Sequence, residues 1–354
     1  MGVRKEIICI LLMAMTMLLS ACSSDESGAQ TVTTGEQPPV GKQVQLMTYA
    51  PNFIEKEASH RAAPDGFSAY ILDKVTDMGL YMLESTTAPY TENVIRYATK
   101  WFAYFNPEAN THYTVYGYMP KEEDKPNEEG MSSSLSSVSS DGAILTISGI
   151  KPVTADDICI ITGVKETDIG LKEGQFHWFI ANANDDFYMY LLMDHLYASV
   201  KFSLKVQEDY ALLRTIKLKT MTLSVNKARV SAAVTLAHNT EGNSPITNVA
   251  YTETGSSCEA EIFNNAEGQA LSSMTPVAVS ACFAPTLSSD LTLNSTYDVY
   301  DSKGNLIRAN CTATNKIPAL NAKRGERVQI NVTINPTYLY VLSDKDLDNL
   351  FVIQ

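Results

Sequence analysis

The sequence lacks the short motifs that mark the common enzyme classes. Its 354 residues contain no GxSxG, GxxxxGK, GxGxxG or CxxC. The histidines are few, they lie more than four residues apart, and none stands in an HExxH motif: His60, His112, His177, His195 and His238. Nucleophilic, phosphate-binding and metal chemistry usually show these spacings. Although distant residues can still converge in space, we predict a protein that is not an enzyme and uses no metal or cofactor.

The chain also lacks any block of basic residues. It carries 27 Lys and Arg against 40 Asp and Glu, a formal net charge of −13 spread along the sequence. Nucleic acids and anionic lipid surfaces attract clustered positive charge. We therefore expect no nucleic-acid partner, and the acidic balance serves solubility.

Long apolar runs are missing except for one at the start of the chain. Arg4 and Lys5 precede the apolar run Ile7–Leu19, and Leu19-Ser20-Ala21-Cys22 follows as a lipobox. The run is shorter than the about 20 residues that a spanning helix needs. We predict a lipoprotein signal peptide at 1–21, with acyl chains on Cys22 that anchor the protein to a membrane.

Cysteines are scarce in the mature chain. Once Cys9 and the lipid site are set aside, four remain: Cys159, Cys258, Cys282 and Cys311. Export permits disulfides, and Cys258 with Cys282 is the nearest pair in sequence. Buried free thiols are the alternative, and the spacing leaves both open.

Helical apolar stripes are also rare, and strand patterns dominate. Residues 22–42 are polar and predict a flexible spacer. Short β-branched and aromatic runs bounded by turn residues then predict strands. We predict them at Val44–Tyr49, Val94–Phe105, Tyr113–Tyr118, Ile144–Ile147, Ile158–Ile161, Tyr197–Val206, Arg214–Val225, Arg229–Leu236, Val277–Phe283, Leu291–Tyr300, Val328–Ile334 and Tyr338–Leu342.

Details of this pattern make further predictions. The apolar register changes near Thr220, as a β-bulge would cause, and 301–305 predicts a hairpin turn. Lys121–Ser140 is charged and then Ser-rich, which predicts a long surface loop. Ser68–Leu80 and Asp185–Leu192 fit helix or strand. The fold class is all-β, with one sandwich domain at 43–192 and a second at 193–354.

Two weaker patterns have ordinary explanations. Asp344–Asn349 begins like a calcium loop but lacks the glycine and the final acidic ligand of that motif, so we expect a polar turn. Exposed aromatic side chains could form a stacking platform for sugars, although packing within strands is the commoner use. The candidates for such a platform are Trp101, Tyr104, Tyr113, Tyr116, Tyr118 and Trp178.

Several motifs in order resemble the fimbrillins and fimbrillin-like surface lipoproteins of Bacteroidetes. They are the lipobox with its spacer, Ser23–Glu26 as an acidic surface-export signal, Tyr116–Pro120, Asp194–Phe202 and Tyr338–Asp348. The resemblance covers nearly the whole mature chain. It implies two transthyretin-like sandwiches joined near residue 193, outer-membrane anchoring, and a role in a type V pilus or related adhesin.

The resemblance further implies maturation by an arginine-specific protease and assembly with other pilin subunits by strand exchange. Arg61-Ala62 matches the position of such a cut. The candidate donor strand is Leu350, Phe351, Val352 and Ile353, although it would also serve as an ordinary last strand. Loss of the strand around Val44–Tyr49 would expose apolar side chains at a cost of the order of 10 kcal/mol.

Two features leave other readings open. The donor segment is short, and Lys42, Lys56 and Arg96 offer competing cleavage sites. The alternatives are a tip or accessory subunit, or an uncleaved surface lipoprotein that binds host or bacterial glycans for nutrient uptake.

Overall fold

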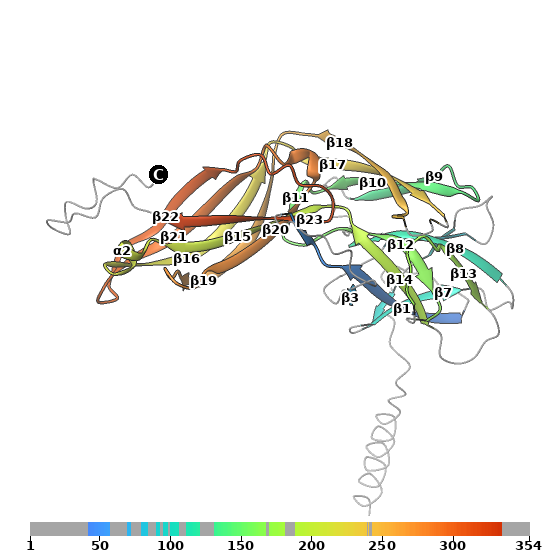
Figure 1. Cartoon of the computed structure of the whole chain (residues 1–354), viewed down its shortest axis with the longest axis horizontal. Coiled ribbons are helices and arrows are strands. Elements are labelled where there is room, and N and C mark those ends of the chain that lie inside the picture. Colours follow the sequence, from blue (N-terminus) through green and yellow to red (C-terminus); the bar gives the residue numbers. More distant parts are fainter. Residues whose placement is uncertain are drawn as a thin grey trace, which may run out of the picture. The chain divides into compact units, whose positions relative to one another are not determined.

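The structure, a computed structural model, describes residues 42–56, 69–71, 79–83, 90–92, 95–97, 100–105, 111–120, 131–167, 170–180, 188–238, 240 and 243–334. These residues are almost all in strands, which confirms the all-β prediction (Figure 1). Helical turns are limited, in this part of the chain, to α2 (Glu208–Ala211) and the 3₁₀ turn η1 (Pro285–Leu287). None of the described helices is long and apolar enough to cross a membrane.

The first sheet, sheet A, holds the N-terminal strands. Its order is β5-β4-β8-β12-β14-β1-β7-β6, with β13 added to β8 and β3 added to β1. Strand β1 lies inside this sheet, parallel to β14 and antiparallel to β7. The strands are β1 (Lys42–Pro51), β3 (Ala69–Ile71), β4 (Gly79–Leu83), β5 (Tyr90–Glu92), β6 (Ile95–Tyr97), β7 (Lys100–Phe105), β8 (Thr111–Met119), β12 (Cys159–Lys165), β13 (His177–Ile180) and β14 (Tyr188–His195).

Sheet C has the order β18-β17-β10-β9. Its strands are β9 (Ser132–Ser136), β10 (Gly142–Ile150), β17 (Arg229–Ala237) and β18 (Ile246–Thr254). The prediction of a loop throughout Lys121–Ser140 is wrong at β9, which pairs antiparallel with β10. A run of serines carries no apolar alternation, yet an edge strand needs only its backbone groups to pair.

Sheets B and D face one another as a sandwich. Sheet B runs β11-β20-β15-β23-β2 and sheet D runs β19-β16-β21-β22, and the strands of sheet D are labelled side by side in Figure 1. Sheet B holds β2 (Ile54–Glu55), β11 (Val153–Thr154), β15 (Ala198–Val206), β20 (Val277–Phe283) and β23 (Glu326–Ile334). Sheet D holds β16 (Arg214–Val225), β19 (Cys258–Ala270), β21 (Thr292–Asp301) and β22 (Leu306–Lys316).

Local features of sheet D match the sequence. The register of β16 against both neighbours shifts between Leu218 and Thr220, which confirms the predicted bulge. The Asp301 carboxylate accepts hydrogen bonds from the amides of Lys303 and Asn305, so it closes the predicted hairpin turn between β21 and β22.

Buried apolar side chains form two clusters. The larger joins the inner faces of sheets B and D, for example Phe202 with Leu223, to residues of sheets A and C. The smaller lies on one face of sheet A, where Val44, Leu46 and Ala50 of β1 are buried in the same cluster as Met189 and Leu191 of β14. Strand β1 is therefore a core strand.

Strand pairing crosses residue 193, where two domains were predicted to meet. Strands β9 and β10 pair within one sheet with β17 and β18, and β2 and β11 join the sheet of β15. The described strands all belong to one compact unit that begins at Val40. The division into domains 43–192 and 193–354 stays a prediction.

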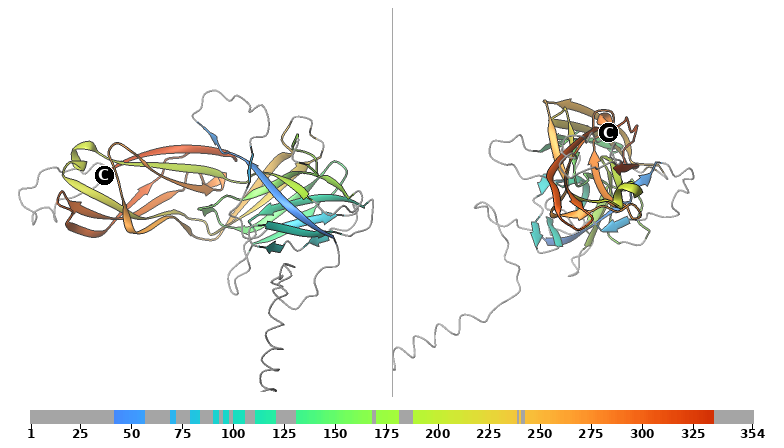
Figure 2. Two further views of the ribbon diagram at one scale, coloured as in Figure 1. Left: turned by 90° about the horizontal axis from the view of Figure 1, so that it is seen from below. Right: turned by 90° about the vertical axis from the view of Figure 1, so that its left-hand side faces the viewer.

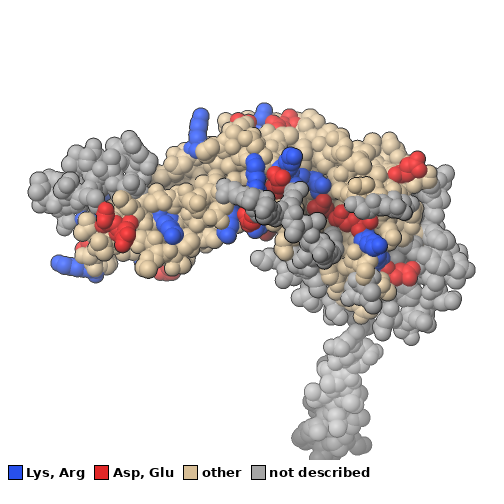
Figure 3. Space-filling model, in the orientation of Figure 1, with Lys and Arg blue, Asp and Glu red and all other residues tan. Residues whose placement is uncertain are grey.

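All four cysteines of the described residues are free thiols. Cys258 and Cys282 do not form the disulfide that the sequence left open. On the face drawn in Figure 3, basic and acidic side chains are interspersed among other residues, in keeping with the spread of charge along the sequence.

Candidate functional site

The site lies where the chain leaves β1 and enters β2. Strand β1 ends at Pro51, which donates no backbone hydrogen bond and suits a strand end, and Asn52 and Phe53 lead into β2. The amide of Ile54 donates to the carbonyl of Gly325 at 2.9 Å, and the amide of Lys56 donates to Arg327 at 2.8 Å. One segment thus pairs with strands of sheets A and B; β1 is the long blue strand in the left view of Figure 2.

Side chains reinforce this pairing. The ammonium of Lys56 donates to the carbonyls of Leu320 at 2.5 Å and Asn321 at 2.7 Å. Glu55 lies 3.8 Å from Arg327, a loose and exposed ion pair that contributes little. The backbone and Lys56 therefore hold β2 against β23.

Phe53 is the central side chain of the site. Its ring stacks on the ring of His195, with centroids 3.8 Å apart and planes inclined by 17°. The guanidinium of Arg327 lies 5.0 Å from the centroid of Phe53. We call His195 and Arg327, the two groups that hold this ring, the socket.

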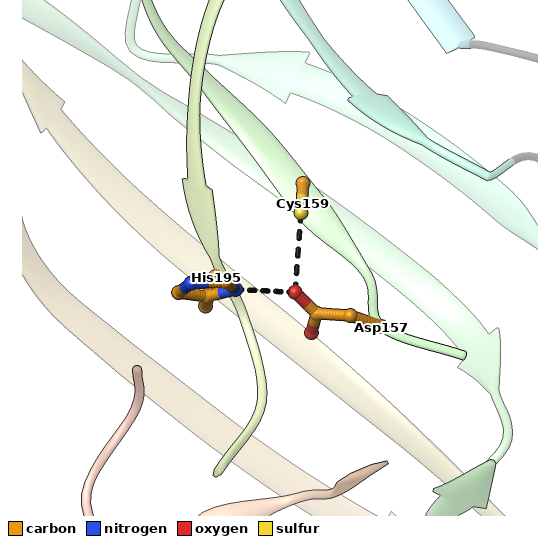
Figure 4. A group of neighbouring side chains, drawn as sticks. All are labelled: Asp157, Cys159 and His195. Atoms are coloured by element: carbon orange, nitrogen blue, oxygen red, sulfur yellow. Dashed lines mark hydrogen bonds and ion pairs between the residues drawn. The ribbon is translucent and has the colours of Figure 1, made fainter. Parts of the chain in front are cut away.

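The socket rests on a buried polar cluster. Figure 4 shows the Asp157 carboxylate between Cys159 and His195. One oxygen, Oδ2, lies 2.5 Å from His195 Nδ1 and 3.1 Å from Cys159 Sγ. Cys159 and His195 are direct partners in the pairing of β12 with β14, which explains why residues far apart in sequence meet here.

Burial and nearby charges set the protonation of His195 and Cys159. Burial lowers the pKa of His195, but the hydrogen bond to Asp157, the charges of Asp157 and Asp194 and a backbone hydrogen bond to Pro51 outweigh it, so the pKa is raised above 6.5. Burial raises the pKa of the Cys159 thiol well above 9.0, and Asp157 raises it further. His195 is thus favoured as a cation and Cys159 as a neutral thiol.

The cluster contains the residue types of a cysteine protease triad in the wrong order. Such a triad needs the histidine between the thiol and the carboxylate, so that it can take the thiol proton. Here the carboxylate lies between the other two, and the thiol is 2% exposed with a raised pKa. The geometry disfavours nucleophilic catalysis.

The same three groups are the metal-ligand candidates among the described residues, since their donor atoms lie within 4.8 Å of one another. The sequence search did not join them, because they share no local motif. Ligands about 2.0–2.3 Å from a zinc ion stand further apart than 2.5 Å. Direct hydrogen bonds account for the cluster, and we assign no metal to it.

Outer contacts fix the cluster in place. Arg324 Nη1 lies 2.5 Å from Asp194 Oδ2 and donates to the carbonyl of His195 at 2.8 Å. The amide of Gly325 donates to the carbonyl of Tyr197 at 2.8 Å. The socket is therefore built on the β14–β15 connection and the start of β23.

Several predicted site residues lie outside the described residues. They are the lipid site Cys22, the cleavage pair Arg61 and Ala62, the donor residues Leu350, Phe351, Val352 and Ile353, and the polar turn Asp344–Asn349. The sequence search missed Phe53, Asp157 and Arg327, and it gave His195 no role beyond its place in the motif Asp194–Phe202. An aromatic residue in a polar stretch was the one local signal for Phe53.

The described side chains of the aromatic set pack in the core, as the sequence favoured, and do not form the alternative stacking platform. Tyr113, Tyr116 and Tyr118 are at most 2% exposed and cannot stack on a sugar. Tyr116 instead bonds to His238 Nε2 at 2.6 Å, and its ring stacks on Phe176. Trp101 and Tyr104 lie in β7 and Trp178 lies in β13, and for these three residues the structure describes the backbone alone.

No family model matches this chain. No curated protein matches it either. Three of the solved structures that resemble it come from Bacteroidetes species and are named for adhesion or fimbriae. A candidate cell adhesion protein from Bacteroides fragilis NCTC 9343 is 11% identical, with a TM-score of 0.40, over 88% of this chain and 96% of that chain.

A candidate cell adhesion protein from Bacteroides ovatus ATCC 8483 is 12% identical, with a TM-score of 0.39, over 83% of this chain and 93% of that one. The fimbrial anchor protein Mfa2 from Porphyromonas gingivalis is 10% identical, with a TM-score of 0.22, over 87% and 95%. Likenesses this distant do not assign a function, so a proposal has to rest on the residues of this chain.

Proposed function

We propose that the protein is a subunit of a cell-surface fimbrium or a fimbrillin-like adhesin, anchored to the outer membrane through Cys22 and matured by a cut after Arg61. The observation that carries this proposal is the position of β1 and β2. The segment ahead of Arg61 supplies a core strand of sheet A and the edge strand of sheet B. Cleavage after Arg61 would break the covalent link between this segment and the rest of the chain, so that β1 and β2 could dissociate.

Removal of this segment would leave unpaired backbone and apolar surface. Val44, Leu46 and Ala50 are at most 3% exposed, and they pack in the cluster of Met189 and Leu191. Burial stabilises by about 1.5–3 kcal/mol for each large side chain, so the vacated strand position costs of the order of 10 kcal/mol once both sides are counted. A cut subunit would recover most of this free energy by binding another strand in the vacated position.

Two of the competing cleavage sites are paired in strands, and the third, Lys56, is hydrogen-bonded next to β2. Lys42 pairs with Phe105, Arg96 pairs with Trp101, and the Lys56 amide and ammonium are both bonded. Proteases need an extended, accessible chain, which paired strands do not offer. Pairing therefore disfavours cleavage at these three residues.

The proposed donor is the C-terminal segment of a neighbouring subunit, with Leu350–Ile353 as its apolar end. Donation from one copy to the next is head-to-tail and does not close, so it builds a filament. Contact with other surfaces would then be made by the assembled subunits.

The test compares the native protein with the variants Arg61→Ala and Lys56→Ala on the cell surface. Mass spectrometry gives the N-terminus and unboiled gel electrophoresis gives the assembly state. We expect a start at Ala62 and high-mass ladders in the native protein and in Lys56→Ala, with both lost in Arg61→Ala. A lipid-modified Cys22 with monomer alone in all three proteins would contradict the proposal.

A further inference from the structure

The ring of Phe53 belongs to the segment that maturation would remove, while the groups that hold it stay behind. His195 stacks on the ring at 3.8 Å and Arg327 lies 5.0 Å from its centroid. Phe53 also packs against the main apolar core. Once this ring leaves, a side chain from elsewhere can enter the space between core, imidazole and guanidinium.

Three contacts that hold the socket come from residues that stay behind, whereas the Pro51 hydrogen bond to His195 and the Glu55 ion pair with Arg327 leave with the segment. Asp157 holds the His195 ring at Nδ1, and Arg324 holds the His195 carbonyl. Arg327 donates through Nε to Ser199 Oγ at 3.3 Å. A site that keeps its shape when empty binds a new group at a lower entropic cost.

The chemistry of the socket favours an aromatic ring. A guanidinium and an imidazole favoured as its cation both attract the face of a π system, and the surrounding carboxylates are engaged, Asp157 with His195 and Asp194 with Arg324. An aliphatic side chain would fill the space without this attraction. A carboxylate would have to bring its charge against a partly buried apolar surface.

We propose that the socket receives an aromatic side chain from the C-terminal segment, residues 335–354, of a second copy of this chain. The inference rests on the proposed function, since a second copy enters only if strands are exchanged. The segment carries three aromatic residues, Tyr338, Tyr340 and Phe351. One of them takes the place of Phe53 and so sets the register of the incoming strand.

Binding through the socket depends on pH in a defined direction. His195 has a raised pKa, so its charge is fully present below pH 6.5 and is lost as the pH rises through the raised value. An aromatic ring in the socket is thus held more tightly in mild acid. The charged and titratable groups around His195 and Arg327 are Asp157, Cys159, Asp194, Cys282, Arg324 and Glu55.

The experiment uses the full chain cut after Arg61 with its N-terminal fragment still bound, and labelled synthetic peptides in excess that compete with this fragment. The peptide of residues 42–56 calibrates the assay, and its Phe53→Leu form should bind about tenfold more weakly. The peptide of residues 335–354 is the probe, in its native form and with Tyr338→Leu, Tyr340→Leu or Phe351→Leu. Fluorescence anisotropy at pH 6 and pH 8.5 gives the dissociation constants.

We expect one of the three leucine peptides to lose about tenfold in affinity at pH 6 and less at pH 8.5. Its loss should shrink when the protein carries Arg327→Gln. Native binding with no loss for any leucine peptide overturns the socket and leaves strand exchange standing. If peptide 42–56 binds and peptide 335–354 does not, strand exchange with this donor fails, and the proposed occupant fails with it.

Discussion

The substitution Phe53→Ala in the uncut protein probes the attachment of β2 to sheet B. It removes the ring that stacks on His195 and lies beside Arg327, and leaves the backbone of β2 unchanged. Before cleavage, this ring adds to the backbone pairing and the Lys56 hydrogen bonds that hold the end of the removable segment. Its loss should loosen β2 locally.

The expected magnitude follows from burial and stacking. A fully buried Phe→Ala change costs about 3–5 kcal/mol, and Phe53 is partly buried, so roughly half of that applies. Stacking on His195 adds about 0.5–1.5 kcal/mol. We therefore expect the opening of β2 to become easier by about 3 kcal/mol.

Hydrogen exchange of the Ile54 and Lys56 amides measures this opening, because both donate across to β23. Exchange at these two amides should accelerate by about a hundredfold, since every 1.4 kcal/mol is a factor of ten. The matched control is Ile54→Ala, because Ile54 is 43% exposed and its side chain contributes little. Equal exchange in Phe53→Ala and Ile54→Ala would refute the role given to the ring.

Three further predictions concern groups around the site and its sheets. Burial and the charge of Asp194 raise the pKa of Glu173 from 4.5 to about 7, against opposing effects of Thr162 and Arg324. The stability that this proton provides is full below pH 4.5 and is lost as the pH rises through about 7. Above pH 7 the Glu173→Gln variant should therefore be more stable than the native protein, by at most about 3 kcal/mol in the free energy of unfolding. Equal urea midpoints of the two proteins at pH 8 would contradict this. Tyr116→Phe leaves buried His238 Nε2 without its donor and should lower the free energy of unfolding by about 1–3 kcal/mol. Urea titration should show a smaller loss of stability for Tyr81→Phe, whose hydroxyl bonds to Ser133 at a half-buried position. Equal losses in the two variants would argue against a special contribution of the buried bond. Gly325 has φ +72°, so Gly325→Ala should lower the free energy of unfolding by about 1–2 kcal/mol and accelerate hydrogen exchange in β2. The control Gly304→Ala, at φ +84° in the β21–β22 turn, should cost as much stability and leave exchange in β2 unchanged. Faster exchange in β2 in both variants would count against a local effect of Gly325.

The strands that were predicted most accurately from the sequence are buried on one face only. In β15 and β16, apolar and polar residues alternate because one face meets the core and the other meets water. Strands β18 and β19 escaped prediction because most of their residues are exposed or half-buried, and polar residues such as Glu259, Glu261 and Asn264 interrupt the pattern. Asp185–Leu192 fitted either structure, and its described part, from Tyr188, belongs to β14, which lies between β12 and β1 in sheet A.

The socket could not be predicted, because register creates it. Asp157 and His195 meet only when β12 and β14 pair with Cys159 opposite His195, and Arg327 arrives from β23 by parallel pairing with β15. Because these pairing partners lie far apart in the sequence, they form no motif with a fixed local spacing. The functional prediction came from ordered motifs and from the position of β1 ahead of an arginine.

The central claim is that a cut after Arg61 frees the position of β1 and β2 for a neighbour's strand. A disulfide between Gln43→Cys and Tyr104→Cys, direct partners across β1 and β7, would hold the cut fragment in place, because opposed residues in antiparallel strands lie within disulfide range. Ladder formation on unboiled gels is then measured before and after reduction, with Gln43→Cys alone as the control. The account predicts cleavage at Arg61 with no ladders until the disulfide is reduced, whereas ladders formed with the fragment still attached would contradict it.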